Sequence, residues 1–380
     1  MLYFMWLSVL IFCIIACIFD FYNINFLLGS TRLSTKNNID FVYIFITSLL
    51  FFTVFLLITS NREGVDIINY YNNYNYIHTL SNRELVYNTL KEFFYNNNLT
   101  FYEFRAILTF VCGILVYFTL LKLNVNIYFF LVFYVPVFLF LDSMQFRNSI
   151  ALCILIFSLY ILASNKTNIN RYTFLFLVIF ASQIHSVYYY YLLLFFFDLK
   201  YKKHIERWVI FIGISLIFLT FLNGNKLPFV ESIISIFLTD GDARLTRYLT
   251  SGRFGFILPF SMDVLLLYIF AWLNKKSIDW KSNNKFSSLF SIIQWNNYLS
   301  IILIPFIMMN MNFYRLLRIN FIISLIPIMV IISNKLLNKE NIRILLSITL
   351  LLGIFWVGFE LFYNSVPIYT PVFQGSFFWE

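Results

Sequence analysis

The chain has 380 residues, of which 61% are hydrophobic and only 12% are charged, and its formal net charge is +9. A soluble domain carries about 25% charged residues, so this composition excludes an ordinary soluble protein and indicates an integral membrane protein. The excess of basic residues suits an anionic lipid surface or an anionic substrate, and we expect membrane lipids rather than nucleic acid as partners.

Cysteine and histidine are too few and too scattered for a metal cage. All four cysteines lie within apolar runs and form no Cys-x-x-Cys pair, and the three histidines, His78, His185 and His204, are far apart. We therefore predict no disulfide, no metal site and no bound cofactor. The first apolar run lacks a basic leader and a small-residue cleavage site, so we expect it to be retained as a span.

Long apolar runs follow one another along the whole chain. Each can cover the 17–25 residues that cross a bilayer. They begin near Leu2, Phe41, Phe104, Ile127, Ser149, Tyr172, Trp208, Phe256, Leu289, Ile319 and Ile344. The sequence thus predicts an all-α polytopic protein with about 11–12 transmembrane helices, forming a single membrane domain over residues 1–380.

Lysine and arginine gather in every second loop, which the positive-inside rule places in the cytoplasm. The opposite side then carries two larger extracytoplasmic loops, at about 60–104 and 223–256, together with short turns and both termini. Residues 172–199 are short for two full spans. We prefer two short helices meeting near Gln183–Ser186 to a single span, because half-length helices are tolerated beside a wet cavity.

The predicted catalytic core covers about residues 142–200. Gln145 and Arg147 stand at the head of one apolar run, and His185 ends the next, after a polar turn at 164–171. If the two runs are antiparallel, Arg147 and His185 return to one membrane face. An ionisable group at the membrane edge is a functional candidate by default. The alternatives are that Arg147 extends to lipid headgroups and that His185 is a packing residue.

The first outer loop begins with Arg62 and Asp66 flanking Gly64, which favours a turn. Tyr70 and further tyrosines follow at roughly helical spacing. Such tyrosines form either a membrane-interface belt or the lining of a sugar site. Late in the chain, Arg315 and Arg318 share one helix face, where one anion could bridge both; lipid phosphate is the alternative ligand.

These residues carry a resemblance to a known family. Gly64-Val65-Asp66 with Tyr70, Arg147-Asn148 entering an apolar helix, Ala181 to His185 ending the next, and the arginine-rich entry Tyr314–Phe321 occur in this order. The chain in this respect resembles the EpsG-type family of bacterial polysaccharide polymerases, which is grouped with the Wzy O-antigen and capsule polymerases.

The resemblance implies a multi-spanning glycosyltransferase on the outer face of the bacterial cytoplasmic membrane. Its substrate would be a polyprenyl-pyrophosphate-linked oligosaccharide, polymerised into O-antigen, capsular or exopolysaccharide without a metal or a nucleotide-sugar. A chain-length regulator and a flippase would be its partners. Two alternatives are a glycan ligase of related architecture and a lipid-linked oligosaccharide flippase or transporter.

The same chemistry assigns roles to the candidate residues. Arginines would neutralise the leaving pyrophosphate, and a histidine or aspartate would accept the proton of the attacking hydroxyl. We therefore predict a catalytic set and a substrate-binding set. The catalytic set is His185, Asp66 and Arg147, and the substrate-binding set is Arg62, Tyr70, Gln145, Arg315 and Arg318.

Overall fold

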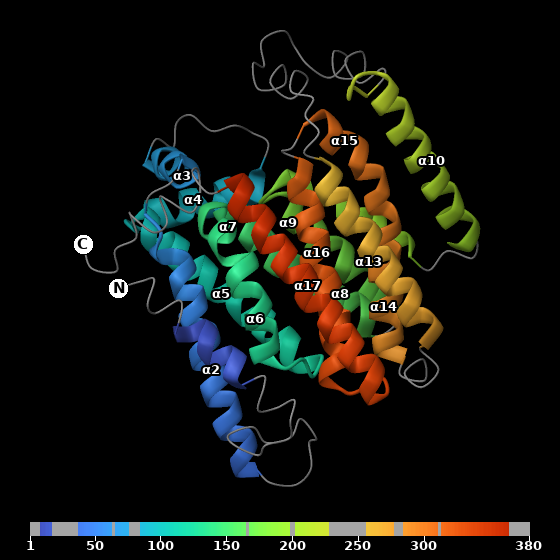
Figure 1. Cartoon of the computed structure of the whole chain (residues 1–380). Helices are drawn as coiled ribbons and strands as arrows, with labels where there is room; N and C mark the ends of the chain where they lie inside the picture. The colour runs from blue at the N-terminus through green and yellow to red at the C-terminus, as the bar shows by residue number, and fades with distance from the viewer. Residues whose placement is uncertain are drawn as a thin grey trace. The chain divides into compact units, whose positions relative to one another are not determined.

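The structure is a computed structural model that describes residues 8–16, 37–62, 65–75, 84–164, 167–197, 202–227, 256–276, 284–310 and 313–364. Every regular element among these residues is a helix, which confirms the predicted all-α class (Figure 1). The chain divides into two compact units. Unit 1 comprises Met1–Leu192 and Ile328–Glu380, and unit 2 comprises Leu193–Pro327.

Eight helices of the described part are long and apolar enough to cross a membrane. They cover Tyr43–Ser60, Phe101–Lys122, Phe146–Ser164, His204–Leu222, Ile257–Lys276, Lys285–Met309, Tyr314–Ser333 and Lys339–Phe359. The number is below the expected 11–12 for identifiable reasons. The run near Leu2 falls partly outside the described residues, and the runs near Ile127 and Tyr172 are each divided into shorter helices.

Unit 1 contains most of the helices. They are α2 (Asn37–Ser60), α3 (Val65–Asn75), α4 (Leu85–Asn96), α5 (Phe101–Lys122), α6 (Ile127–Val137), α7 (Leu139–Met144), α8 (Phe146–Ser164), α9 (Asn168–Ser182) and α17 (Lys339–Asn364). Helix α8 packs against α5 and α9, and α5 packs against α2. A Cβ at Gly113 would lie 2.9 Å from the Phe55 ring, so this glycine permits the close approach of α5 to α2.

Unit 2 consists of α10 (Lys202–Leu222), α13 (Ile257–Lys276), α14 (Asn284–Ser300), η4 (Ile301–Leu303), α15 (Ile304–Met309) and the first part of α16 (Tyr314–Ser333). Polar side chains are paired inside it. Ser300 Oγ lies 2.6 Å from Asp263 Oδ1, and Ser324 Oγ lies 2.8 Å from Asn297 Oδ1. All four residues are buried, so the helices are joined by hydrogen bonds as well as by apolar packing.

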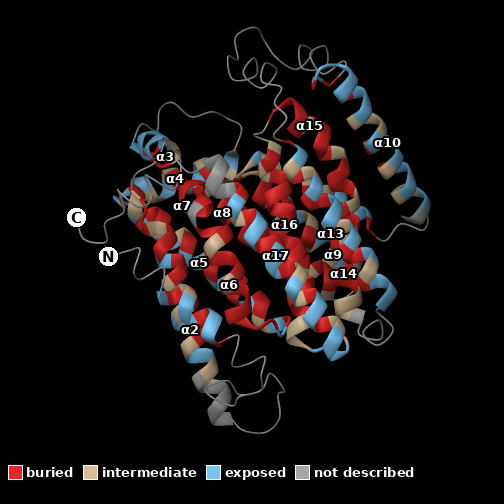
Figure 2. Ribbon diagram, viewed as in Figure 1, coloured by how far each residue is buried: buried red, intermediate tan, exposed pale blue. Residues whose placement is uncertain are grey.

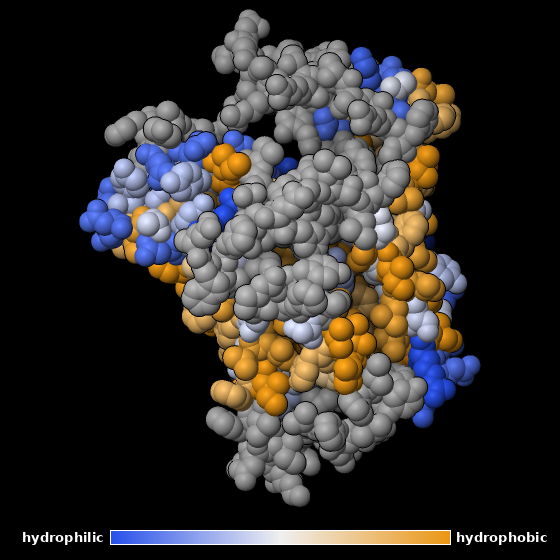
Figure 3. Space-filling view, turned by 60° about the vertical axis from the view of Figure 1, so that its left-hand side comes forward, coloured by the Kyte–Doolittle hydropathy of each residue, from blue (hydrophilic) through white to orange (hydrophobic). Residues whose placement is uncertain are grey.

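The surface of the described helices carries large apolar side chains. Phe45 and Leu49 on α2 and Trp208, Phe211 and Phe218 on α10 are examples. Figure 2 shows α6 buried over nearly its whole length, whereas α2 mixes buried and exposed residues and α10 is mostly exposed or intermediate. Large hydrophobic areas cover the described surface in Figure 3. Lipid rather than water is the solvent that such a surface requires, so this is a multi-pass membrane protein.

Arg105 is a buried cation within the span α5, and it binds backbone carbonyls rather than a carboxylate. Its guanidinium donates hydrogen bonds to the carbonyl oxygens of Ile58, Asn61 and Ser143. These carbonyls lie at the ends of α2 and α7, where no further helical turn can use them. Arg105 therefore joins the ends of two helices to α5, next to the loop that carries α3 and α4.

Residues 172–197 form two short helices, α9 and the 3₁₀-helix η2 (Ser186–Phe196), separated at Gln183–His185. The break lies where the two short helices are predicted to meet, and the predicted return of the second helix to the cytoplasmic side stays a prediction. Buried residues recur every third position in η2, which is the period of a 3₁₀-helix. They are Tyr188, Tyr191 and Leu194, and Phe197 continues the series.

Candidate functional site

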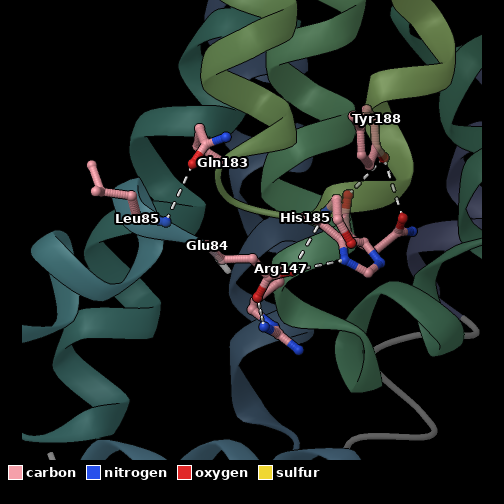
Figure 4. Close-up of polar contacts among 8 residues, drawn as sticks. Glu84, Leu85, Arg147, Gln183, His185 and Tyr188 are labelled. Atoms are coloured by element: carbon pink, nitrogen blue, oxygen red, sulfur yellow. Dashed lines mark hydrogen bonds and ion pairs between the residues drawn. The ribbon is translucent and has the colours of Figure 1, made fainter. Parts of the chain in front are cut away.

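The side chains of Arg147 and His185 meet at the carboxylate of Glu84, and the three residues come from distant parts of unit 1 (Figure 4). Glu84 directly precedes α4, Arg147 is the second residue of α8, and His185 lies between α9 and η2. Because α8 and α9 are joined by a short turn and pack together, the start of α8 and the end of α9 lie at the same end of the pair. The structure thus brings Arg147 and His185 to one carboxylate.

The two oxygens of Glu84 have different partners. Oε2 accepts a hydrogen bond from Arg147 Nη1, and the two side chains form an ion pair. Oε1 lies 3.5 Å from Nδ1 of His185. The exposed fractions of the Glu84 and His185 side chains are only 12% and 14%, against 28% for Arg147. The arginine is therefore the member of the group most accessible to a ligand.

Backbone hydrogen bonds hold the group in place. The first N–H of η2, on Ser186, donates to Glu84 Oε1 at 3.4 Å, so the carboxylate caps that helix. In the other direction, Leu85 N–H donates to Gln183 Oε1 at 3.4 Å, and Tyr87 N–H donates to the Gln183 carbonyl oxygen at 3.3 Å. The start of α4 and the junction of α9 with η2 therefore cap each other.

Two tyrosines contact the guanidinium of Arg147. Its central carbon lies 5.0 Å from the centre of the Tyr70 ring and 5.3 Å from that of Tyr87, within cation–π range. Burial raises the pKa of the Tyr87 hydroxyl. Within the described ranges, neither this hydroxyl nor Nε of Arg147 has a hydrogen-bond partner, although both atoms are buried. Two unpaired buried donors in one place suit a ligand rich in acceptor oxygens.

The helices of the first loop are fixed to unit 1 by polar contacts. Lys91 on α4 is buried and donates to the Asn73 carbonyl oxygen at 2.9 Å, near the end of α3. Tyr74 on α3 donates to the Leu99 carbonyl oxygen at 2.7 Å, just before α5. Tyr70 and Tyr87 are therefore presented to Arg147 by helices that are themselves held in place.

Asn148 forms the support behind His185. The hydroxyl of Tyr188 donates to the Asn148 carbonyl oxygen at 2.9 Å and lies 3.3 Å from Oδ1 of the same residue. Tyr188 is the third residue of η2, and its ring centre is 6.3 Å from that of His185. This contact holds the start of η2 against the start of α8, and with it the backbone that carries the histidine.

The carboxyl of Glu84 is stabilised in its charged form. Burial alone would raise its pKa, but the nearby His185 side chain, the charge of Arg147 and the N–H of Ser186 together lower the pKa below its usual value. Glu84 is therefore a carboxylate at neutral pH and forms an ion pair with Arg147.

The other candidates of the first loop are not tied to Glu84. Asp66 lies in the first turn of α3, and no contact among the described residues joins it to Glu84, Arg147 or His185. Arg62 lies 5.1 Å from the centre of the Tyr102 ring. Gln145 is buried directly after α7, one residue before α8 begins. Their assigned roles stay predictions.

Arg315 and Arg318 belong to unit 2, at the start of α16. Arg318 is 1% exposed and Arg315 is half-buried. The cytoplasmic or external placement of either residue, and its role in binding pyrophosphate, likewise stay predictions. In the described part of the chain, no group of three or more His, Cys, Asp or Glu side chains has a geometry that could hold a metal ion.

The sequence interpretation missed Glu84 and Tyr87. The stretch Glu84–Asn96 does carry a signal, because apolar residues recur at helical spacing from Leu85 onward. An amphipathic helix in a loop implies that one of its faces packs on the protein. Hydropathy alone, however, does not show which membrane helix receives that face, so the meeting of Glu84 with Arg147 and His185 could not be predicted.

Comparison with known proteins gives one family. The sequence model of the EpsG family matches residues 42–373, which include every residue of the site. No curated protein and no solved structure matches the chain.

Acidification should remove the stability that Glu84 contributes. Its pKa is lower in the folded state, so the contribution is present above the ordinary value of about 4.3 and is lost as the pH falls through the folded-state pKa. At pH 7 we expect Glu84→Gln to reduce the free energy of unfolding by about 2 kcal/mol. The difference from wild type should shrink near pH 3.

The measurement is thermal unfolding of the purified protein in detergent at the two pH values. Glu92→Gln is the matched control, because it removes a carboxylate from the same helix α4. An equal destabilisation by Glu84→Gln at both pH values would contradict the assignment of a charged Glu84.

Proposed function

The chain belongs to the EpsG family, and we propose that it is a polymerase that joins polyprenyl-pyrophosphate-linked oligosaccharide repeat units at the outer face of the bacterial cytoplasmic membrane. Membership supports a polysaccharide polymerase-type function, and hence glycosyl transfer, in general terms. The observation that carries the finer proposal is the meeting of Arg147 and His185 at one carboxylate, beside two tyrosines of the first loop.

The proposed reaction needs a base and a group that receives negative charge. A hydroxyl of the acceptor sugar attacks the anomeric carbon of the donor, and the bond from that carbon to the pyrophosphate oxygen breaks. The hydroxyl proton passes to His185, and the bonding electrons leave with the pyrophosphate. Pyrophosphate is a good leaving group once its charge is neutralised, so the protein has to supply cations and a base.

Arg147 is suited to bind the leaving pyrophosphate. Only Nη1 is used by Glu84, and Nε–H has no hydrogen-bond partner within the described residues. The rings of Tyr70 and Tyr87 both contact the guanidinium, and such contacts limit the orientations that its remaining donors can adopt. The Tyr87 hydroxyl adds a further donor beside them. An oxygen-rich phosphate is the kind of ligand that can use these donors together.

His185 is suited to act as the general base. A histidine changes its charge near neutral pH, and a neighbouring carboxylate stabilises the imidazolium that proton transfer would form. Asp66 remains the second candidate for this role, and Tyr70, Arg62 and Gln145 are proposed to contact the sugars. The substrate would thereby lie between the first loop and the ends of α8 and α9, all within unit 1.

Replacement of His185 should separate catalysis from folding. We expect His185→Gln to reduce chain formation at least about 100-fold, because general-base catalysis contributes about 10²–10⁴-fold, while the protein stays inserted and abundant. The assay incubates purified protein with the lipid-linked repeat unit and resolves the products as a ladder. The control, His204→Gln, changes an exposed histidine at the start of α10. A wild-type ladder from His185→Gln would remove the residue from the mechanism.

The arginine pair of α16 gives a separate test. If Arg315 and Arg318 hold pyrophosphate, each single lysine replacement should lower activity about tenfold, because lysine keeps the charge but loses the paired N–H donors. Arg343→Lys, on an exposed position of α17, is the control. A normal ladder from the double Lys variant would assign the pair to lipid phosphate instead.

A further inference from the structure

Glu84 contacts both Arg147 and His185, and the proposed mechanism uses it only as a counter-charge to the imidazolium. We propose that Glu84 is the positioning residue of His185: it fixes the ring proton on Nδ1 and thereby directs Nε2 toward the acceptor hydroxyl. This inference rests on the proposed function and adds a residue to it.

The assignment of the ring proton follows from the donor inventory. A carboxylate oxygen can only accept a hydrogen bond, and Oε1 of Glu84 faces Nδ1 at 3.5 Å. An attractive contact therefore requires the proton on Nδ1, which leaves the lone pair on Nε2. The distance is long for a hydrogen bond. Contacts of this kind commonly shorten when the substrate binds, because the ligand displaces water and closes the site.

Glu84 is well held for this purpose. Arg147 binds its other oxygen, and the Ser186 N–H at the start of η2 binds the same oxygen that faces the histidine. Gln183 fixes the backbone on the other side of the contact through Leu85 and Tyr87. A carboxylate held by two donors on a fixed backbone can orient an imidazole, whereas an exposed and mobile one would lose that orientation.

The neighbours of His185 include one anion and one cation. Glu84 comes from the start of α4, Arg147 from α8 and Tyr188 from η2, while the rings of Tyr70 and Tyr87 contact the arginine. Arg147 alone would disfavour a second positive charge on the histidine. The carboxylate between them offsets that repulsion, so the imidazolium formed by proton transfer gains a direct counter-charge.

The glycosyl transfer requires no proton transfer to Glu84. The acceptor oxygen forms its bond to the anomeric carbon, and its proton goes to Nε2 of His185. The bond to the pyrophosphate oxygen breaks, and that oxygen keeps the electron pair near Arg147. Glu84 stays ionised throughout and stabilises the imidazolium, as an orienting carboxylate does in other histidine-based sites. The imidazolium afterwards returns its proton to water.

The test is the pH dependence of Glu84→Gln, assayed with purified protein and the lipid-linked repeat unit. We expect kcat to fall about tenfold or more while KM changes less than about threefold. The acidic limb of the plot of kcat against pH should move to lower pH by about one pH unit, because the imidazolium loses its counter-charge and His185 deprotonates more readily. Glu84→Asp keeps the negative charge, so the acidic limb of its pH–rate profile should stay at the wild-type pH while the rate falls.

Glu92→Gln is again the matched control and should keep the wild-type profile. An unchanged limb in Glu84→Gln, with activity lowered only in proportion to the folded protein, would overturn the proposal and leave Glu84 a structural residue. Loss of activity at every pH in Glu84→Gln, together with an active His185→Gln, would overturn it by making Glu84 the base. Failure of the wild-type protein to form a ladder would refute the proposed function itself, and is thereby distinguished from failure of this inference.

Discussion

The structure of unit 1 depends on how the negative charge of one carboxylate is balanced at a site that is largely shielded from water. Glu84 lies almost buried, so its charge has to be matched by partners that stay in place. The compensation comes from Arg147, from His185 and from the first N–H of η2. Since these partners belong to the ends of α8, α9 and η2, matching one charge also fixes the first loop on unit 1.

The same rule governs other polar groups within the protein. Within the described ranges Arg105 has no carboxylate among its hydrogen-bond partners, and its Nη1 and Nη2 donate to carbonyls at the ends of α2 and α7. In unit 2, Ser300 pairs with Asp263, and Ser324 pairs with Asn297. Such groups join helices where the hydrophobic effect does not favour one helix neighbour over another. Around Arg147, buried donors without partners among the described residues accompany a histidine and a carboxylate.

Hydropathy and charge patterns predicted much of this architecture, because lipid imposes a minimum length on every span. The spans beginning near Phe41, Phe104 and Ser149 correspond to α2, α5 and α8, and the division of residues 172–197 into two helices was also predicted. The short turn between α8 and α9 made it possible to predict that Arg147 and His185 share one end. Glu84 was not predictable, because the path of a polar loop depends on tertiary contacts that leave no periodic pattern. The shortening of α6, which ends after Pro136, was equally hidden in a continuous apolar run.

The central claim is that Arg147 and His185 act in one reaction at a shared site. The direct measurement compares the chain-forming rates of Arg147→Lys, His185→Gln and the double variant, with long incubations so that losses of about 10³-fold remain measurable. Parts of one catalytic unit are not additive, so the double variant should lose at most about threefold more activity than the worse single variant. A loss equal to the product of the two single losses would contradict the account, because it would mean that the two residues act independently.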